Sequence, residues 1–330
     1  MEKLRIGVIG AGNMGRNHVR ILSSEKRNCE FVGFFDADEK RAGEVSRQFS
    51  VRAFPSAQAL MEQVDAVTVA APSSKHKEIA IEAAGRGLHA LVEKPLALTA
   101  EDAREISDAF AAARRVLMIG HVERYNPVVT ELCKLVRHEK ITALEVRRYS
   151  PYNGRINDAD VVQDLMIHDI DLVCNVLMQA EPKGVYAVGE STLSGKLDFV
   201  QSLMQFDSGI VAGVGASRIT QSKVREIVVH TDCSYILADL LGRSLSVMRN
   251  TNLVIDEGKE SAYRQDSVIQ RVFVPMVEPL HMELTDFMDC VIQNREPMAD
   301  GPAACRAIGI AEIISGQALR RLAAVTGGVG

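Results

Sequence analysis

The chain has 330 residues, more than one compact core usually holds, and this length predicts two domains. A net charge of −5 leaves no basic footprint and argues against a nucleic acid as the main partner. No apolar stretch approaches the ~20 residues of a membrane span, and the start runs directly into an apolar segment, so we expect no signal peptide. Single, scattered cysteines without metal-ligand spacing indicate reduced thiols, a cytoplasmic location and no metal site: Cys29, Cys133, Cys174, Cys233, Cys290 and Cys305.

The first part of the chain alternates between strand-like and helical patterns. Apolar runs predict strands near 4–9, 31–35, 65–71, 89–93 and 116–119. Helical periodicity fills 13–24, 38–49, 75–86 and 99–114. Thr99 is the expected N-cap of the last helix. This alternation predicts parallel crossovers and an open, doubly wound α/β sheet, in which ligands bind at the carboxyl ends of the strands. The loops after Ile9, Ala71 and Val92 are therefore the candidate site.

The first of these loops is Gly10-Ala11-Gly12-Asn13-Met14-Gly15. In a dinucleotide site, one glycine makes the tight turn, one admits the pyrophosphate and one lets the helix pack closely. The phosphates then face the free N–H groups at the helix N-terminus. Asp36 closes the second strand roughly 20 residues later, where an acid hydrogen-bonds the ribose hydroxyls. The pattern predicts a dinucleotide site; the alternative is a glycine-rich turn beside a solvated aspartate.

Asp36 also favours NAD as the cofactor. A carboxylate accepts from the 2′-hydroxyl of NAD but repels the 2′-phosphate of NADP. The residues that follow supply no arginine until Arg41, after two further acids. We interpret Lys40 and Arg41 as solvated charges on a helix face rather than as phosphate ligands.

Glu93-Lys94-Pro95 stands at the carboxyl end of the fourth predicted strand. A lysine at this edge can hydrogen-bond a substrate hydroxyl and stabilise the negative charge that develops on its oxygen. Pro95 favours an extended Lys94; a cis bond between the two is the less common alternative. Taken alone, the tripeptide is also compatible with a turn and a surface salt bridge.

The second part of the chain predicts an α+β domain, because successive strands follow one another without helices between them. A helical pattern covers 163–178, and further helices are expected at 279–293 and 302–323. Phe206-Asp207-Ser208-Gly209 is typical of a hairpin turn. The strands are expected at 184–191, 197–206, 210–217, 224–230, 235–240 and 244–248.

The helix at 163–178 carries the second candidate for chemistry. Asp164 and His168 are four residues apart and so share one helix face, with Asp171 one turn further along. An imidazole can take a hydroxyl proton near neutral pH, and the carboxylate of Asp164 can orient it and favour its cationic form. The alternative is an exposed acidic helix face with an incidental histidine.

Four motifs in this order resemble the glucose–fructose oxidoreductase / inositol dehydrogenase / MocA family over essentially the whole chain. They are the glycine loop, Ala70-Ala71-Pro72-Ser73-Ser74-Lys75-His76, Glu93-Lys94-Pro95 and the Asp164–Asp171 helix. The resemblance implies a Rossmann domain over 1–121 and, over 122–330, an α+β substrate-binding and oligomerisation domain with a large open, mostly antiparallel sheet. It implies Lys94, Asp164 and His168 as catalytic residues. The residues it implies at the cofactor are Gly10, Gly12, Asn13, Met14, Gly15, Asp36, Ala71, Pro72, Ser73, His76, Glu93, Lys94 and Arg124.

Two further segments resemble the branch of this family that contains UDP-N-acetylglucosamine 3-dehydrogenases. They are Gly120-His121-Val122-Glu123-Arg124-Tyr125-Asn126-Pro127 and Gly154-Arg155-Ile156. The resemblance implies Tyr125 and Arg155 at the substrate, together with Lys94, Asp164 and His168. The chain departs from the family before the catalytic helix, where Asp158–Gln163 replaces frequent glycines, and at Met166. We expect this added bulk to reshape the substrate pocket.

The sequence thus predicts a cytoplasmic, homodimeric or homotetrameric NAD-dependent dehydrogenase. It would oxidise a secondary hydroxyl of a sugar or nucleotide sugar, such as the 3-hydroxyl of UDP-N-acetylglucosamine. His168 would accept the hydroxyl proton and Lys94 would hydrogen-bond the oxygen, or these two roles would be exchanged. One alternative is an epimerase or glycosidase that oxidises its substrate only transiently. Another is a non-catalytic NAD-dependent sensor, which would not need Lys94, Asp164 and His168 together.

Overall fold

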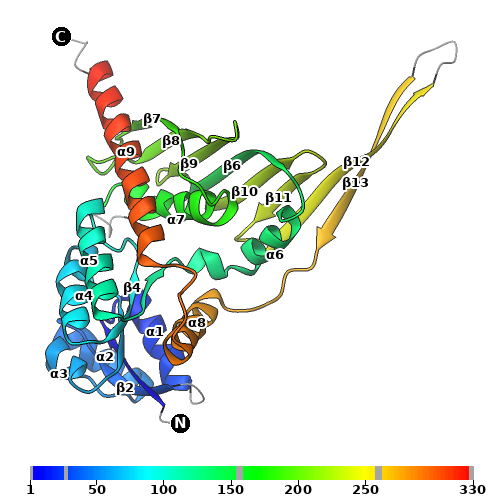
Figure 1. The fold of residues 1–330 in the computed structure, drawn as a ribbon. Coiled ribbons are helices and arrows are strands. Elements are labelled where there is room, and N and C mark those ends of the chain that lie inside the picture. Colours follow the sequence, from blue (N-terminus) through cyan, green and yellow to red (C-terminus); the bar gives the residue numbers. More distant parts are fainter. Residues whose placement is uncertain (1–2, 26–28, 154–158, 257–261, 327–330) are drawn as a thin grey trace. The chain divides into compact units, whose positions relative to one another are not determined.

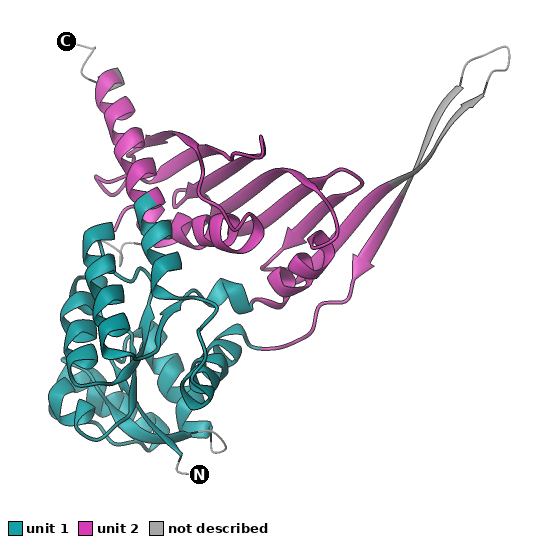
Figure 2. Cartoon of the chain, viewed as in Figure 1, with its two compact units in different colours: residues 1–125, 278–309 teal, residues 126–277, 310–330 magenta. Residues whose placement is uncertain are grey.

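The chain folds into two units, which comprise residues 1–125 with 278–309 and residues 126–277 with 310–330 (Figure 2). The structure, a computed structural model, describes residues 3–25, 29–153, 159–256 and 262–326. The domain boundary predicted from the sequence lies at residue 121 instead, and it assigns all later residues to the second domain. The difference arises because helix α8 (Pro279–Gln293) buries Leu280, Leu284 and Phe287 in the core of unit 1.

Unit 1 is built on a parallel sheet with the strand order β2-β1-β3-β4-β5. Strands β2 and β4 of this sheet are labelled in Figure 1. All strands of the sheet except the edge strand β2 are almost entirely buried, as their continuous apolar runs predict, and the expected doubly wound α/β sheet is confirmed. Thr99 caps helix α5 by accepting the N–H of Asp102 at 3.1 Å, also as predicted. The strands are β1 (Leu4–Ile9), β2 (Cys29–Phe35), β3 (Ala66–Val69), β4 (His89–Glu93) and β5 (Leu117–Gly120). The other elements before unit 2 are α1 (Asn13–Ser24), α2 (Glu39–Phe49), α3 (Ala57–Met61), η1 (Ser73–Lys75), α4 (His76–Gly85), α5 (Ala100–Ala113) and η2 (Val122–Tyr125).

Unit 2 contains a mostly antiparallel sheet with the strand order β13-β12-β11-β10-β6-β9-β8-β7, in which β6 and β9 pair in parallel. This confirms the expected α+β domain, and the predicted hairpin turn closes with Gly209 at φ +80°. Its strands are β6 (Ile141–Tyr149), β7 (Gly184–Glu190), β8 (Phe199–Gln205), β9 (Val211–Ser217), β10 (Val224–Thr231), β11 (Tyr235–Asp239), β12 (Ser244–Asp256) and β13 (Ala262–Val272). Its helical segments are α6 (Pro127–Val136), η3 (Val162–Met166), α7 (Ile167–Asp171), η4 (Leu172–Leu177) and the later turns of α9 (Gly301–Thr326).

The free edge of β7 is covered by side chains of α9. Gln317 accepts the N–H of Ala187 at 3.1 Å and donates to the carbonyl of Val185 at 2.8 Å. Arg321 donates to the carbonyl of Ala187 at 2.7 Å and stacks on Tyr186. An unpaired strand edge would otherwise recruit another strand, so α9 terminates the sheet here. No helix in the described part of the chain is long and apolar enough to cross a membrane.

Candidate active site

The glycine loop between β1 and α1 has the geometry that a bound pyrophosphate needs. Gly10 has φ +89°, and a Cβ there would lie 2.7 Å from the backbone of Ala70. A Cβ on Gly15 would lie 1.8 Å from the carbonyl oxygen of Gly10, so only glycine lets α1 pack this closely. Gly12 lies at the N-terminus of α1 with nothing within 4 Å of a Cβ position. The loop thus provides turn, open approach and close packing at separate glycines, and Asn13 and Met14 begin the helix.

A pocket of about 710 Å³ adjoins this loop and suits the adenosine half of a dinucleotide. Gly10, Gly12 and Asp36 line it, together with Ala71 and Pro72. Asp36 is only 7% exposed and accepts the N–H groups of Ala11 at 2.6 Å and of Asp38 at 2.8 Å. These two bonds hold the carboxylate at the end of β2, where a ribose would be recognised.

Arg41 also lies at this pocket. Its Nη1 is 3.2 and 3.3 Å from the two carboxylate oxygens of Asp36, and its Nη2 is 3.1 Å from Asp38. Lys40 is exposed and the Arg41 side chain is 42% exposed, as expected of solvated helix-face charges, although Arg41 also pairs with Asp36. Sequence reasoning missed this pair, although the one-turn spacing from Asp38 places Arg41 on the same side of α2.

His76 connects the loops that follow β3 and β4. Its ring nitrogens Nδ1 and Nε2 each lie 2.9 Å from a carbonyl oxygen, those of Pro95 and Ala71 respectively. The side chain is 1% exposed, and burial lowers its pKa below the usual histidine value. A neutral ring has a single N–H and donates to one of these carbonyls at a time. His76 therefore holds the two loops together, while Ser73 begins the short helix η1.

The end of β4 presents Glu93 and Lys94. Glu93 is buried, and its Oε1 lies 3.0 Å from Nε2 of the buried His18 on α1. A Cβ on Gly120 would lie 2.9 Å from the Glu93 carboxyl group, so glycine at the end of β5 makes room for it. Lys94 is half-buried, and its bond to Pro95 is cis.

A second acid is buried in unit 1 beside this group. Glu283 on α8 is fully buried, and neither of its carboxylate oxygens has a hydrogen-bond partner among the described residues. Burial first, and then the negative charges of Glu93 and Asp286, raise its pKa well above the usual value. Burial thus favours the neutral carboxylic acid of Glu283 over its carboxylate. No sequence pattern distinguishes it from an ordinary helix-surface glutamate.

Arg124 and Tyr125 are buried at the end of unit 1. Arg124 donates to the carbonyl oxygen of Met298, and the Tyr125 hydroxyl donates to Asp286 on α8 at 2.6 Å. Burial and the neighbouring Asp286 raise the pKa of Tyr125 above its usual range. The predicted roles of Arg124 at the cofactor and of Tyr125 at the substrate stay predictions, and Arg155 lies outside the described residues.

Asp164 and His168 lie on a helix of unusual form in unit 2. The segments η3 and η4 are π-helical and flank the α-helical residues Ile167–Asp171. Such π-helical segments occur frequently at functional sites. Asp164 and His168 are half-buried, whereas Asp169 is 1% exposed. The structure thus leaves the predicted pair on the more accessible side of the helix.

Asp169 on this helix forms an ion pair with the sheet of unit 2. Arg148 on β6 contacts both carboxylate oxygens of Asp169, at distances from 2.7 to 3.0 Å, and both residues are buried. Val161, Val162 and Met166 are fully buried. These three side chains therefore pack into unit 2, and the effect of the bulkier segment on the substrate pocket stays a prediction. The described residues contain no cluster of potential metal ligands.

The family pattern described as "Oxidoreductase family, NAD-binding Rossmann fold" matches residues 4–121, and the GFO/IDH/MocA C-terminal domain matches residues 140–235. UDP-N-acetylglucosamine 3-dehydrogenase of Acidithiobacillus ferrooxidans is 32% identical over 94% of this chain and 96% of its own. This chain belongs to the Gfo/Idh/MocA oxidoreductase family. It is an NAD-dependent oxidoreductase, and unit 1 carries its cofactor site.

Two further comparisons extend along nearly the whole chain. A crystal structure of the Acidithiobacillus enzyme superimposes with a TM-score of 0.87 and covers 96% of this chain and 98% of that one. The scyllo-inositol 2-dehydrogenase (NAD(+)) of Bacillus subtilis is 25% identical over 90% of this chain and 89% of its own. Both domains are therefore shared with these relatives in the same order.

Proposed function

We propose that this protein oxidises the 3-hydroxyl group of UDP-N-acetylglucosamine to a ketone with NAD as the oxidant. The observation that carries the proposal is the likeness to the Acidithiobacillus enzyme named for this reaction, which spans 94% of this chain. The segment Gly120–Pro127 supports it, because it resembles that branch of the family. The Bacillus subtilis relative is named for scyllo-inositol, a cyclic polyol that also carries secondary ring hydroxyls.

In the proposed mechanism, His168 takes the proton of the substrate hydroxyl as the C–O bond becomes a carbonyl. Asp164 orients the imidazole and favours its cationic form. Lys94 donates a hydrogen bond to the same oxygen and stabilises the negative charge that develops there. NAD, when bound, supplies the acceptor for the hydride that leaves the carbon. Arg155 and Tyr125 are proposed contacts for the rest of the substrate.

The test is NADH formation on addition of UDP-N-acetylglucosamine, with UDP-glucose and free N-acetylglucosamine as comparisons. We expect net NADH and a 3-keto product with the first compound, and a primary isotope effect when carbon 3 carries deuterium. His168→Ala should lower kcat by roughly 10²- to 10⁴-fold and leave NAD affinity unchanged. Substrate conversion without net NADH would identify a transiently oxidising enzyme instead. NAD binding without any sugar turnover would favour the sensor.

We further propose a cytoplasmic homodimer or homotetramer. All six cysteines are free, which agrees with a reducing compartment. The outer face of the unit 2 sheet exposes apolar side chains, among them Tyr186 at 51% and Leu203 at 50%, on neighbouring strands and directly opposite each other. A second copy of this chain would cover such a surface.

A further inference from the structure

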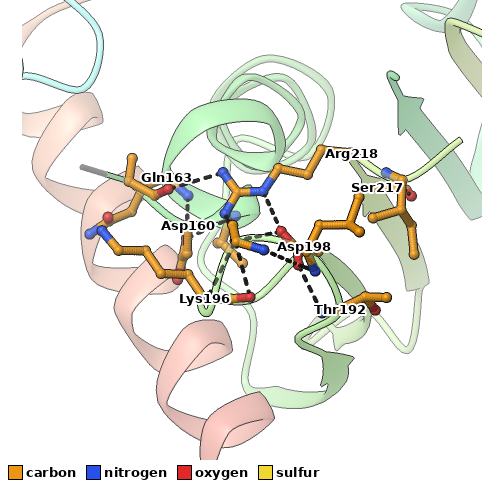
Figure 3. Close-up of polar contacts among 12 residues, drawn as sticks. Asp160, Gln163, Thr192, Lys196, Asp198, Ser217 and Arg218 are labelled. Atoms are coloured by element: carbon orange, nitrogen blue, oxygen red, sulfur yellow. Dashed lines mark hydrogen bonds and ion pairs between the residues drawn. The ribbon is translucent and has the colours of Figure 1, made fainter. Parts of the chain in front are cut away.

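A buried ion pair lies directly behind the start of the helix that carries Asp164 and His168. Asp198 precedes β8 and is fully buried, and Arg218 follows β9 and is 5% exposed. Nε of Arg218 donates to Oδ1 of Asp198 at 2.7 Å, and Figure 3 shows the two side chains facing each other. A pair this deeply buried is costly to desolvate, so its remaining hydrogen bonds decide what it contributes.

The loop before β8 satisfies the carboxylate completely. Oδ2 of Asp198 accepts the backbone N–H groups of Thr192, Leu193 and Ser194 at 2.8, 2.6 and 3.0 Å. The Ser194 hydroxyl lies 2.6 Å from Oδ1 and 2.7 Å from Nη2 of Arg218. Burial opposes the charged form of Asp198, but these hydrogen bonds outweigh it and hold its pKa well below the usual range. The carboxylate is therefore a fixed negative charge that orients the guanidinium.

The third arm of the guanidinium reaches the segment that begins the helix. Nη1 of Arg218 donates to the carbonyl oxygen of Ala159 at 3.1 Å. The next residue, Asp160, accepts the N–H groups of Val162 and Gln163, each at 2.9 Å, as a helix N-cap. Its second oxygen accepts from Ser315 of α9 at 2.8 Å. The start of the helix is thus held from two sides by elements distant in the sequence.

Asp160 is also hydrogen-bonded to Asp164, the residue proposed to orient His168. The N–H of Asp164 donates to the carbonyl oxygen of Asp160 at 3.0 Å. We propose that Arg218 is a positioning residue that fixes the start of this helix and thereby the orientation of Asp164 toward His168. This inference rests on the proposed function, because it assigns Arg218 a task in that reaction. Arg148 fastens the same helix further along, at Asp169.

The direct test is Arg218→Lys. Lysine keeps the positive charge, but a single ammonium cannot serve Asp198, Ala159 and Ser194 together. We expect kcat with UDP-N-acetylglucosamine and NAD to fall roughly 10- to 100-fold, the usual effect of a small misplacement. The acidic limb of the pH profile of kcat/KM should move to lower pH, because a displaced Asp164 favours cationic His168 less. NAD affinity, measured by calorimetry, should stay unchanged.

Two further variants separate positioning from stability. Ser315→Ala removes only the hydroxyl that Asp160 accepts, and should move the acidic limb in the same direction with a smaller loss of kcat. Arg321→Lys is the matched control, because Arg321 also binds a backbone carbonyl in unit 2, that of Ala187, at 2.7 Å. It should leave kcat and the pH profile at their wild-type values. Lowered melting temperatures with unchanged kcat and pH profiles for Arg218→Lys and Ser315→Ala would overturn the proposal.

A readout without substrate distinguishes this proposal from the proposed function. The imidazole of His168 can be titrated by NMR in protein with labelled histidine and assigned through His168→Gln. The charged groups to compare are Asp164, Asp169 and Asp171 on its own helix segments and Arg148 on β6. The titration midpoint should fall in Arg218→Lys and Ser315→Ala and stay constant in Arg321→Lys. If the wild-type protein forms no NADH, the proposed function is wrong. If the titration midpoint of His168 does not change in Arg218→Lys and Ser315→Ala, the positioning role is wrong.

Discussion

We propose that Asp36 and Arg41 together set the choice of cofactor at the ribose. One guanidinium faces two carboxylates, those of Asp36 and Asp38, so the group keeps a net negative charge. Asp36→Ser should weaken NAD binding, because the ribose of NAD loses a hydrogen-bond acceptor. It should also reduce the difference between NAD affinity and NADP affinity, because the carboxylate no longer repels the 2′-phosphate of NADP. Calorimetric affinities for both cofactors measure this.

Arg41→Ala is the matched variant for this prediction. It leaves Asp36 without its counter-charge, so NADP affinity should fall while NAD affinity changes little. The ratio of the two affinities should therefore move in opposite directions in the two variants. Tighter binding of NADP than of NAD by the wild-type protein would contradict the assignment.

Lys94 is the residue where a structural and a chemical role predict different results. If Lys94 stabilises charge on the substrate oxygen, Lys94→Ala should lower kcat by about 10²-fold or more. Lys94→Arg should restore little, because a planar guanidinium does not replace a compact ammonium. NAD affinity should survive in both, since the pyrophosphate faces the glycine loop.

Lys77→Ala is the control for Lys94→Ala. Lys77 lies in the same unit and pairs with Asp102 at 2.5 Å and with Glu105 at 2.8 Å on the surface. Its removal should leave kcat unchanged. A Lys94→Ala enzyme with near-normal kcat would remove Lys94 from the mechanism.

At the scale of elements, two glycines at the junction of β1 and α1 have different expected roles. Gly15 allows close packing, and Gly12 allows NAD to bind. In Gly15→Ala the new methyl group would overlap the carbonyl of Gly10, at 1.8 Å, so the melting temperature should drop. In Gly12→Ala the methyl group enters open space at φ −64°, which alanine adopts freely. This variant should melt like the wild type in the absence of NAD and lose NAD affinity. Equal stability of the two apo-proteins would contradict these roles.

Elements with a continuous or periodic apolar pattern were predictable from the sequence. This covers the five strands of unit 1, most strands of unit 2 and the capped helix α5. Strand β6 was missed because its buried face reads Leu144, Val146 and Arg148, and the arginine interrupts the apolar alternation. Helix α6, the short α3 and strand β13 were also missed. The π-helical form of η3 and η4 leaves no pattern that separates it from an α-helix.

In the candidate site, too, some features were predictable from the sequence and others were not. Motifs that combine strand, loop and helix located Gly10–Gly15, Asp36 and Lys94 correctly at the carboxyl ends of strands. Contacts between distant segments, such as His18 with Glu93, were not predictable, because they depend on how helices pack. The same holds for Arg218, which follows a strand without any distinguishing neighbour in the sequence.

At the scale of the whole molecule, Glu283 gives stability a pH dependence. Its folded-state pKa lies above the value of an unfolded glutamate, so the native protein binds a proton that the unfolded chain releases. This contribution is complete below the unfolded pKa and is lost as the pH rises toward the folded one. Glu283→Gln should therefore gain stability relative to the wild type as the pH rises, measured by melting temperature. The exposed Glu296→Gln should show no such trend.

The outer face of the unit 2 sheet predicts self-association. Leu203→Asp places a charge on this face, on the strand next to edge strand β7, and should reduce the molar mass measured by light scattering. Leu319→Asp on α9 is the control, since Leu319 is equally exposed at 50% but lies off the sheet. A monomeric wild-type protein, or an unchanged mass in Leu203→Asp, would contradict the proposal.

The division of the chain has a consequence for its synthesis. Unit 1 starts at the N-terminus, but its core includes Leu280, Leu284 and Phe287 of α8. A ribosome therefore makes all of residues 126–277 before the NAD-binding unit can close. Nascent chains released before residue 293 would expose the apolar surface that α8 covers and become targets for chaperones and proteases. A fragment that ends at residue 121, although it contains every strand of the Rossmann sheet, should not fold into a stable NAD-binding protein.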